Sequence, residues 1–138
     1  IVEDRTRLEE LDGLVLTEEP WGFSDDRIDI VFNCEDSEEN DHTHYRRSGM
    51  TQVHAKRAVE NDVTVAFNLQ LLFTDHKAKY MGRMMQNVRI CQKYDVPMRL
   101  ISLAEHPKDM RHPKDVEALG RVLGMTDEEA RDAVEWNF

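Results

Sequence analysis

Four short apolar runs rich in β-branched residues recur along the chain, each with polar or turn-forming residues on both sides. They lie at residues 14–16, 28–32, 63–67 and 98–103. Runs of this length and composition predict β-strands. The third run is almost continuously apolar, which is typical of a strand in a sheet that is buried on at least one face.

Helical periodicity fills the stretches between the later runs, at residues 51–61 and 77–94. Pro113 suits the first position of a further helix, and Gly124 suits the left-handed residue that closes it. Thr126 predicts the cap of a last helix, with Glu129 as its capping-box partner. Strands and helices therefore alternate from about residue 28, which predicts βαβ crossovers and a parallel sheet covered by helices.

Four parallel strands fit either a small open sheet or about half of a (β/α) barrel of roughly 250 residues. The chain has 138 residues and begins with isoleucine rather than methionine. We therefore expect a single domain that is a fragment of a longer protein, and this favours the half barrel. Residues 35–40 contain no apolar residue and are expected to be disordered or inserted.

Composition argues against a membrane-spanning protein and against a protein with an N-terminal targeting signal. No run approaches the roughly 18 apolar residues of a membrane-spanning helix, and the acidic N-terminus does not resemble a targeting signal. Cys34 and Cys91 lack the CxxC spacing of a metal site and are expected to be small core residues. We accordingly expect a cytoplasmic protein that folds without disulfides or metal.

The net charge of −10 conceals a strong partition along the chain. Residues 1–41 contain 15 acidic and 3 basic residues, whereas residues 42–104 contain 4 acidic and 10 basic residues. A cationic centre within an acidic chain indicates an anion-binding surface. The alternative is that these charges cluster by chance on a solvated face.

The predicted helix 77–94 separates apolar from basic residues when it is turned at 100° per residue. Its apolar arc comprises Met81, Met84, Met85, Val88 and Cys91, and the opposite arc comprises Lys79, Arg83, Gln86, Arg89 and Lys93. Residues 76–94 include no acid, so the basic arc lacks the i,i+4 ion pairs that are usual on a surface helix. This arc predicts a phosphate-bearing partner; alternatively, it faces the acidic N-terminal third of the same chain.

A second acid-free run, 42–59, holds Arg46, Arg47, Lys56 and Arg57. Thr51 is placed to cap the helix that follows, so the free N–H groups of its first turn would lie near the first two arginines. Such an arrangement can receive a phosphate, and it can equally be an ordinary loop and cap.

Enzymatic chemistry has little support in the sequence. His42 and His44 have the HxH spacing with which some metal-dependent phosphoesterases begin, but the predicted strands end at residues such as Asn68 and Ser102 rather than at further ligands. No nucleophile elbow, P-loop or GxGxxG motif occurs. We expect neither a metal site nor a catalytic residue, and a metal-dependent phosphoesterase of barrel fold remains the alternative function.

Three segments together resemble ribonuclease P protein component 3, the archaeal relative of the thirty-kilodalton subunit of eukaryotic ribonuclease P. They are Ser48-Gly49-Met50 followed by Ala55-Lys56-Arg57-Ala58-Val59-Glu60-Asn61, then Val65-Ala66-Phe67-Asn68-Leu69, and the segment from Lys108 to Met125. The resemblance runs from about residue 28 to 134 and preserves the order of the elements. Gln52 stands where the family usually has a histidine, and the first strands of the family are expected to be missing.

The resemblance implies a TIM-barrel-like α/β fold with a parallel sheet, of which residues 1–138 would form roughly the C-terminal half to two-thirds. It implies a protein subunit that binds and stabilises the catalytic RNA of ribonuclease P, which removes the 5′ leader from precursor tRNA. The implied partners are that RNA, another protein subunit and, indirectly, precursor tRNA; no cofactor is implied. The basic residues expected to contact RNA phosphates are Arg46, Arg47, Lys56, Arg57, Lys79, Arg83, Arg89, Lys93, Lys108, Arg111 and Lys114.

Overall fold

A single parallel sheet organises the chain in the computed structural model, which describes residues 1–37 and 39–135. The strands are β1 (Leu16–Thr17), β2 (Ile30–Phe32), β3 (Thr64–Asn68) and β4 (Met98–Ile101). Their order across the sheet is the order along the chain. The prediction of an α/β fold with a parallel sheet is confirmed, and within the described residues the sheet is open, with β1 and β4 at its edges.

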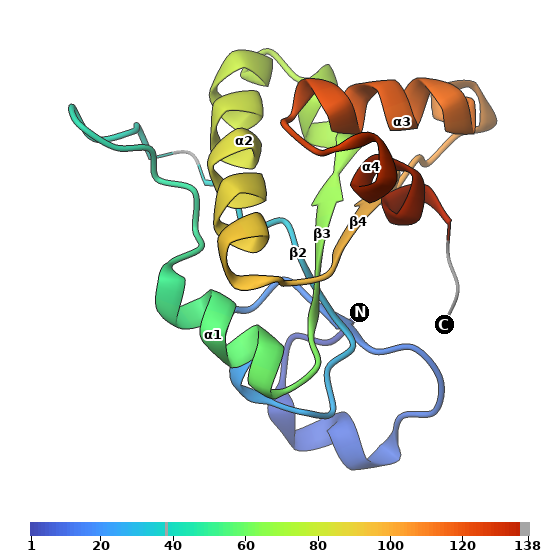
Figure 1. Cartoon of the computed structure of the whole chain (residues 1–138). Helices are drawn as coiled ribbons and strands as arrows, with labels where there is room; N and C mark the ends of the chain where they lie inside the picture. Colours follow the sequence, from blue (N-terminus) through green and yellow to red (C-terminus); the bar gives the residue numbers. More distant parts are fainter. Residues whose placement is uncertain (38, 136–138) are drawn as a thin grey trace.

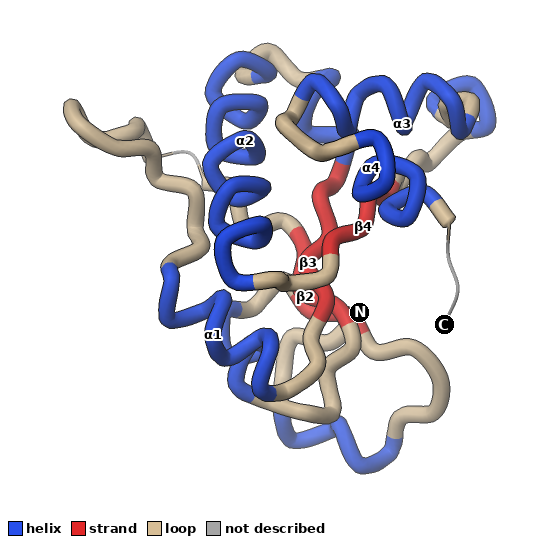
Figure 2. The backbone as a smooth tube through the Cα atoms, in the orientation of Figure 1, coloured by secondary structure: helices blue, strands red, loops and turns tan. Residues whose placement is uncertain are grey.

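Among the described residues, two α-helices lie between successive strands and two more follow the last strand. They are α1 (Gln52–Glu60), α2 (Lys77–Tyr94), α3 (Pro113–Val122) and α4 (Asp127–Val134). Short 3₁₀ helices are η1 (Arg5–Glu10), η2 (Pro20–Ser24), η3 (Leu69–Phe73) and η4 (Pro107–Asp109). In Figure 1, α1 and α2 stand on one side of the strands, and α3 and α4 lie toward β4. Figure 2 shows the long loop before α1 projecting beyond α2.

The helix boundaries follow the local signals in the sequence. Pro113 opens α3, and Gly124 adopts a φ of +108° just beyond its end. Thr126 caps α4 in a capping box with Glu129, as predicted. Thr51 caps α1, and there His54 takes the position of the capping-box acid. Among the described residues, no helix combines the length and the apolar character that a lipid bilayer requires.

Strand side chains alternate between two faces of the sheet, as the period of two requires. One face packs beneath the helices, where the main core contains Val31, Val65, Phe67, Met98 and Leu100 together with Ala55, Val88, Leu123 and Ala130. The opposite face has a smaller apolar cluster of Ile30, Phe32, Ala66 and Ile101. A sheet that is covered by helices on one face and apolar on the other matches the layering of a (β/α) barrel wall.

Candidate functional site

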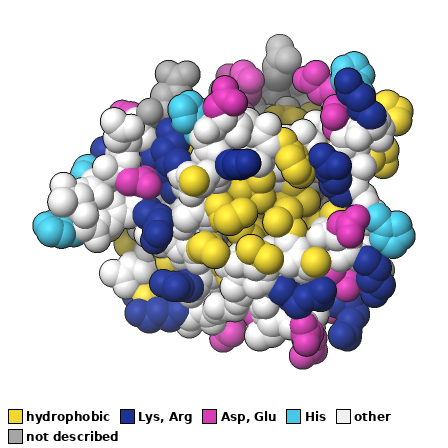
Figure 3. All heavy atoms as spheres, turned by 90° about the horizontal axis from the view of Figure 1, so that it is seen from above, with side chains coloured by type: hydrophobic (Ala, Val, Ile, Leu, Met, Phe, Trp, Pro, Cys, Tyr) yellow, Lys and Arg dark blue, Asp and Glu magenta, His cyan; other side chains and the backbone are white. Residues whose placement is uncertain are grey.

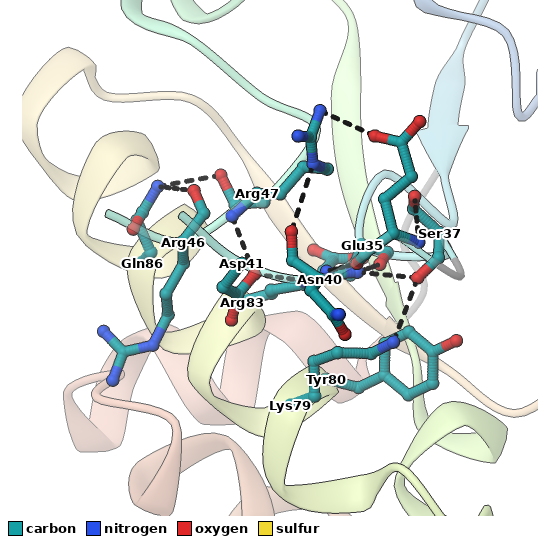
Figure 4. A network of polar contacts seen from close by, with 12 residues as sticks. Glu35, Ser37, Asn40, Asp41, Arg46, Arg47, Lys79, Tyr80, Arg83 and Gln86 are labelled. Carbon is teal, nitrogen blue, oxygen red and sulfur yellow. Dashed lines mark hydrogen bonds and ion pairs between the residues drawn. The ribbon is translucent and has the colours of Figure 1, made fainter. Parts of the chain in front are cut away.

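Arg83 turns inward, although the helical periodicity predicted that it faces solvent. Its side chain is fully buried, and Nη1 donates to the carbonyls of Glu35 and Ser37, each at 2.9 Å. Nη2 donates to the carbonyl of Glu39, and Nε lies 2.9 Å from Oδ1 of Asp41. Figure 4 shows the chain segment wrapped around the guanidinium. The predicted exposure of Arg83 is therefore wrong, and Arg83 leaves the set of candidate RNA contacts.

The segment 35–41 is tied to α2 by these contacts. The expected disorder at residues 35–40 is wrong for the residues described there, because three of their carbonyls bind Arg83; Glu38 lies outside the described residues. One of the two interpretations of the basic helix is thus partly correct, since Arg83 does face the acidic N-terminal third. Lys79 also contacts this acidic third, because its Nζ donates to the carbonyl of Ser37 at 3.2 Å.

Glu35 lies buried beside Arg83. Its Oε1 accepts a hydrogen bond from Nδ2 of Asn87 at 2.8 Å. Burial raises the pKa of Glu35 from 4.5 to about 7, although the Asn87 amide and the Arg83 charge oppose this rise. Within the described residues, neither Oε2 of Glu35 nor Oδ1 of Asn87 has a hydrogen-bond partner. Burial therefore favours the protonated form of Glu35, in which Oε2 is no longer a charged acceptor without a donor.

Asp41 connects the buried network to the surface. Its Oδ1 accepts from the backbone N–H of Arg47 at 2.8 Å and from Nε of Arg83 at 2.9 Å. Partial burial opposes the carboxylate charge, but these two donors hold the pKa of Asp41 below its usual value. Arg47 forms an ion pair with Glu39 at 2.7 Å, and its Nε donates to the carbonyl of Asn40 at 3.4 Å. Arg47 is therefore neutralised within its own loop.

Arg46 points away from this network, as Figure 4 shows. Nε2 of Gln86 on α2 donates to the Arg46 carbonyl at 3.3 Å and to Oγ of Ser48 at 3.0 Å, which fixes the backbone of the loop. The Arg46 side chain crosses α2 at Gly82, where a Cβ atom would lie 2.5 Å from Nε of Arg46. No ion pair or side-chain hydrogen bond with another described residue engages its guanidinium.

Further basic residues gather where the C-terminal end of α2 meets α1. The Nζ atoms of Lys56 and Lys93 lie 5.8 and 5.4 Å from the ring centre of Tyr94, whose hydroxyl donates to Oε1 of Gln52 at 2.8 Å. Arg89 is also exposed. The name "α2 basic face" is used below for Arg46, Lys56, Arg89 and Lys93. Arg57 points elsewhere, toward η2, and donates to Oγ of Ser24 at 2.7 Å.

A second group, Lys108, Arg111 and Lys114, is exposed at the other end of the molecule. The guanidinium carbon of Arg111 lies 4.5 Å from the ring centre of Phe73, and Lys114 is paired with Glu117 at 3.4 Å. Figure 3 shows hydrophobic side chains in the middle of one face with lysine and arginine around them. An apolar groove of about 360 Å³ is lined by Leu69, Phe73, Arg111, Asp115, Val116, Ala118, Leu119 and Val122.

The predicted basic residues are thus spread along α2 rather than gathered in one pocket. Phe73, which carries Arg111, belongs to η3 just before α2, whereas Lys56 and Lys93 lie at the C-terminal end of that helix. An 18-residue helix is about 27 Å long. Such a distance suits an extended polyanion better than a small phosphate compound.

The carboxyl ends of the strands are where a barrel enzyme carries its catalytic groups. Here Asn33 donates to Glu18, Asn68 donates to Oδ1 of Asn33 at 2.9 Å, and Gln70 donates to Oγ of Ser102 at 3.0 Å. The backbone N–H of Gln70 also donates to Asn68, at 3.1 Å. These amides and the hydroxyl bind one another. Among the described residues, no group of three or more His, Cys, Asp or Glu side chains is placed to hold a metal ion.

Gly82 and Asn87 were not among the functional residues predicted from the sequence. A glycine in a helix interior is less favourable than alanine by about 1 kcal/mol, so Gly82 was a usable signal of a close contact. Asn87 offered no such signal, because its partner Glu35 is 52 residues away along the chain.

Comparison with known proteins gives one consistent result. The family model described as RNase P subunit p30 matches residues 39–138. Ribonuclease P protein component 3 of Methanosarcina mazei is 34% identical over 92 residues, which cover 64% of this chain and 38% of that protein. The protein of the same name from Methanococcoides burtonii is 34% identical over 86 residues, which cover 60% of this chain and 36% of that protein.

The fold is similar to that of one chain in a cryo-EM structure of archaeal ribonuclease P with mature tRNA. The TM-score is 0.72 at 19% identity, and the match covers 87% of this chain and 52% of that chain. The chain spans about 38% of the length of the curated relatives it matches. Because the family model matches more than half of the sequence, the resemblance seen in the sequence is confirmed and the chain belongs to the RNase P subunit p30 family.

Proposed function

We propose that this chain acts as part of a protein subunit of ribonuclease P, where it binds and stabilises the catalytic RNA that removes the 5′ leader from precursor tRNA. The observation that carries the proposal is the α2 basic face. All four of its residues are exposed and lie within the part matched by the family model. The proposal places the chain in the cytoplasm, as expected from its sequence.

Phosphate contact is the chemistry that this face supports. Lysine and arginine bind phosphate oxygens through charge-assisted hydrogen bonds, and such contacts position an RNA without reading its sequence. Arg89 and Lys93 are exposed on a helix with no acidic residue, so an RNA backbone meets no competing carboxylate from α2 itself. Precursor tRNA would be contacted only indirectly, through the RNA subunit.

The proposal also includes a protein partner from the same particle. The apolar groove beside Phe73 is a candidate surface for it, because exposed apolar patches mark interaction sites. We further propose that residues 1–138 fold as one domain. Support comes from the main core, which contains residues from Val2 to Ala133.

Neutralising two residues of the α2 basic face tests the RNA contact. With Arg89→Gln and Lys93→Gln combined, we expect weaker binding to the ribonuclease P RNA of Methanosarcina mazei. Each lost phosphate contact should lower the slope of log affinity against log salt concentration by about 0.7 to 0.9. Titrations of labelled RNA at several KCl concentrations measure both quantities.

Arg131→Gln on α4 is the control, since it removes a positive charge from an exposed position outside the α2 basic face; the change per charge removed is the quantity to compare. An affinity and salt slope that stay at wild-type values in the double variant would refute the proposed contact. Hydrolysis of precursor tRNA by the chain in the absence of the RNA subunit would instead support a phosphoesterase.

A further inference from the structure

The α2 basic face has a gap toward the N-terminal end of the helix. At 100° per residue, Gly82, Gln86, Arg89 and Lys93 fall within about 60° of arc, so they share one line along the helix. Arg89 and Lys93 on this line are exposed, whereas Gly82 is buried. Gly82 contributes no side chain to this line. The neighbouring Arg83 does not fill the gap, because its guanidinium is held by the segment 35–41.

Arg46 fills the gap from the loop before α1. Its Nε, Cδ and Cζ atoms would lie 2.5, 3.2 and 3.3 Å from a Cβ built on Gly82, so the side chain rests directly on the helix backbone. Gln86, one turn further along α2, holds the Arg46 carbonyl and Ser48 Oγ. Gln86 therefore fixes the backbone of the loop at Arg46, and Gly82 leaves the space in which the Arg46 side chain lies against α2.

Arg46 differs from its two neighbours in having no close ion pair with a described residue, although its charge contributes to lowering the pKa of Asp41. Arg47 is paired with Glu39, and Arg83 is paired with Asp41. Among the described residues, no carboxylate lies within ion-pairing distance of Arg46. Packing of the Arg46 side chain against Gly82 limits its conformations, which lowers the entropy lost on binding.

We propose that Arg46 is the phosphate-binding residue at the N-terminal end of the α2 basic face and that Gly82 is its positioning residue. The inference rests on the proposed function and defines the ligand group at this point as a phosphate of the RNA backbone. The planar guanidinium can bind two phosphate oxygens side by side. Any residue larger than glycine at position 82 displaces that group from the line of the helix.

The substitution Gly82→Ala tests the positioning role. The clash involves only the outer part of an exposed side chain, and alanine favours the helix by about 1 kcal/mol, so the variant should fold. We expect its affinity for the Methanosarcina mazei ribonuclease P RNA to fall about tenfold, as for the loss of one charge-assisted hydrogen bond. The affinity of Arg46→Gln should fall by a similar factor, and the slope of its log affinity against log salt concentration should drop by about 0.7 to 0.9.

The double variant Gly82→Ala with Arg46→Gln completes a double-mutant cycle, which measures the coupling between the two positions. It should bind as Arg46→Gln alone does, because the glycine acts only through the arginine. Arg46→Lys should keep the salt slope but lose part of the affinity, since lysine carries the charge but lacks the paired N–H donors of the planar guanidinium. Thermal unfolding of each variant verifies the fold.

The outcomes separate the two proposals. If Gly82→Ala binds like wild type while Arg46→Gln is weakened, the positioning role is refuted. If Arg46→Gln also binds like wild type while Arg89→Gln with Lys93→Gln is weakened, Arg46 is not a phosphate contact and the proposed function stands. If none of these variants is weakened, the proposed function fails as well. Additive losses in the double variant also overturn the link between the two residues.

Discussion

Three arginines beside α2 have the same functional group and three different environments. Arg83 is buried with carbonyls and a carboxylate on its donors, Arg47 pairs with an exposed acid, and Arg46 lies against a glycine with its charge exposed. A buried guanidinium is tolerated only where its donors are satisfied, because desolvation of the charge is expensive. The environment of each arginine, rather than its type, decides whether it is available to a ligand.

Glu35 should make the stability of the chain depend on pH. Its folded-state pKa of about 7 is above the usual 4.5, so the folded state holds the proton more tightly. The resulting stabilisation is complete below pH 4.5 and is lost as the pH rises through 7. Glu35→Gln should therefore be more stable than wild type at pH 8, by up to about 3 kcal/mol, and nearly equal to it at acidic pH. Urea unfolding at a series of pH values measures the difference.

Glu60→Gln, at an exposed position on α1, is the matched control and should show the same pH dependence as wild type. A constant stability difference between Glu35→Gln and wild type across this pH range would contradict the raised pKa.

At the scale of elements, the loop between β2 and α1 is shaped by a close backbone approach. Gly49 has a φ of +77°, and a Cβ atom there would lie 1.8 Å from the carbonyl oxygen of Cys34. No side chain fits between these two backbones. The glycine of the Ser-Gly-Met motif is thus explained by packing and not by flexibility, and it sets the path by which Arg46 and Arg47 reach α2.

Gly49→Ala should be severely destabilising, whereas Gly13→Ala should be mild. Gly13 shares a positive φ of +90° but has nothing within 4 Å of its Cβ position, so it isolates the backbone strain. We expect a loss of about 1 kcal/mol at Gly13 and of at least about 3 kcal/mol at Gly49, where a clash is added. Denaturant unfolding of both variants provides the comparison. Equal losses would show that the loop moves to accept the methyl group.

The elements were predictable from the sequence to the extent that their signals are local. The bounds of α2 agree with the periodicity, and the caps at Thr51 and Thr126 lie where predicted. The first strand was placed at 14–16 but is found at Leu16–Thr17. The environment of Arg83 was not predictable, because its hydrogen-bond partners lie 42 to 48 residues away and no helical period reports them.

At the scale of the whole molecule, the net charge of −10 is a poor guide to the surface. Some acidic residues of the first third form ion pairs with basic residues of the same third. Arg27 and then Arg5 pair with buried Asp25 and hold its pKa down to about 2. Asp41 forms an ion pair with Arg83 and accepts a hydrogen bond from the backbone N–H of Arg47. The α2 basic face therefore remains cationic on an acidic protein, and local charge governs its association with a polyanion.

The sheet should also be unequal in its resistance to local opening. All five residues of β3 are buried, and β3 is hydrogen-bonded to strands on both sides, whereas β1 has two residues at an edge. Amide hydrogen exchange should be slowest in β3, with opening free energies close to that of global unfolding. It should be faster in β1 and η1. Equal protection of β1 and β3 in exchange measured by NMR would contradict this gradient.

The order of the strands has a consequence for the synthesis of the chain. Each strand from β2 onward lies beside the strand that precedes it in the sequence. A chain that emerges from the ribosome can therefore add one strand at a time to an edge that is already formed. No strand has to wait for a distant partner, which shortens the time during which an unpaired apolar edge is exposed to other nascent chains.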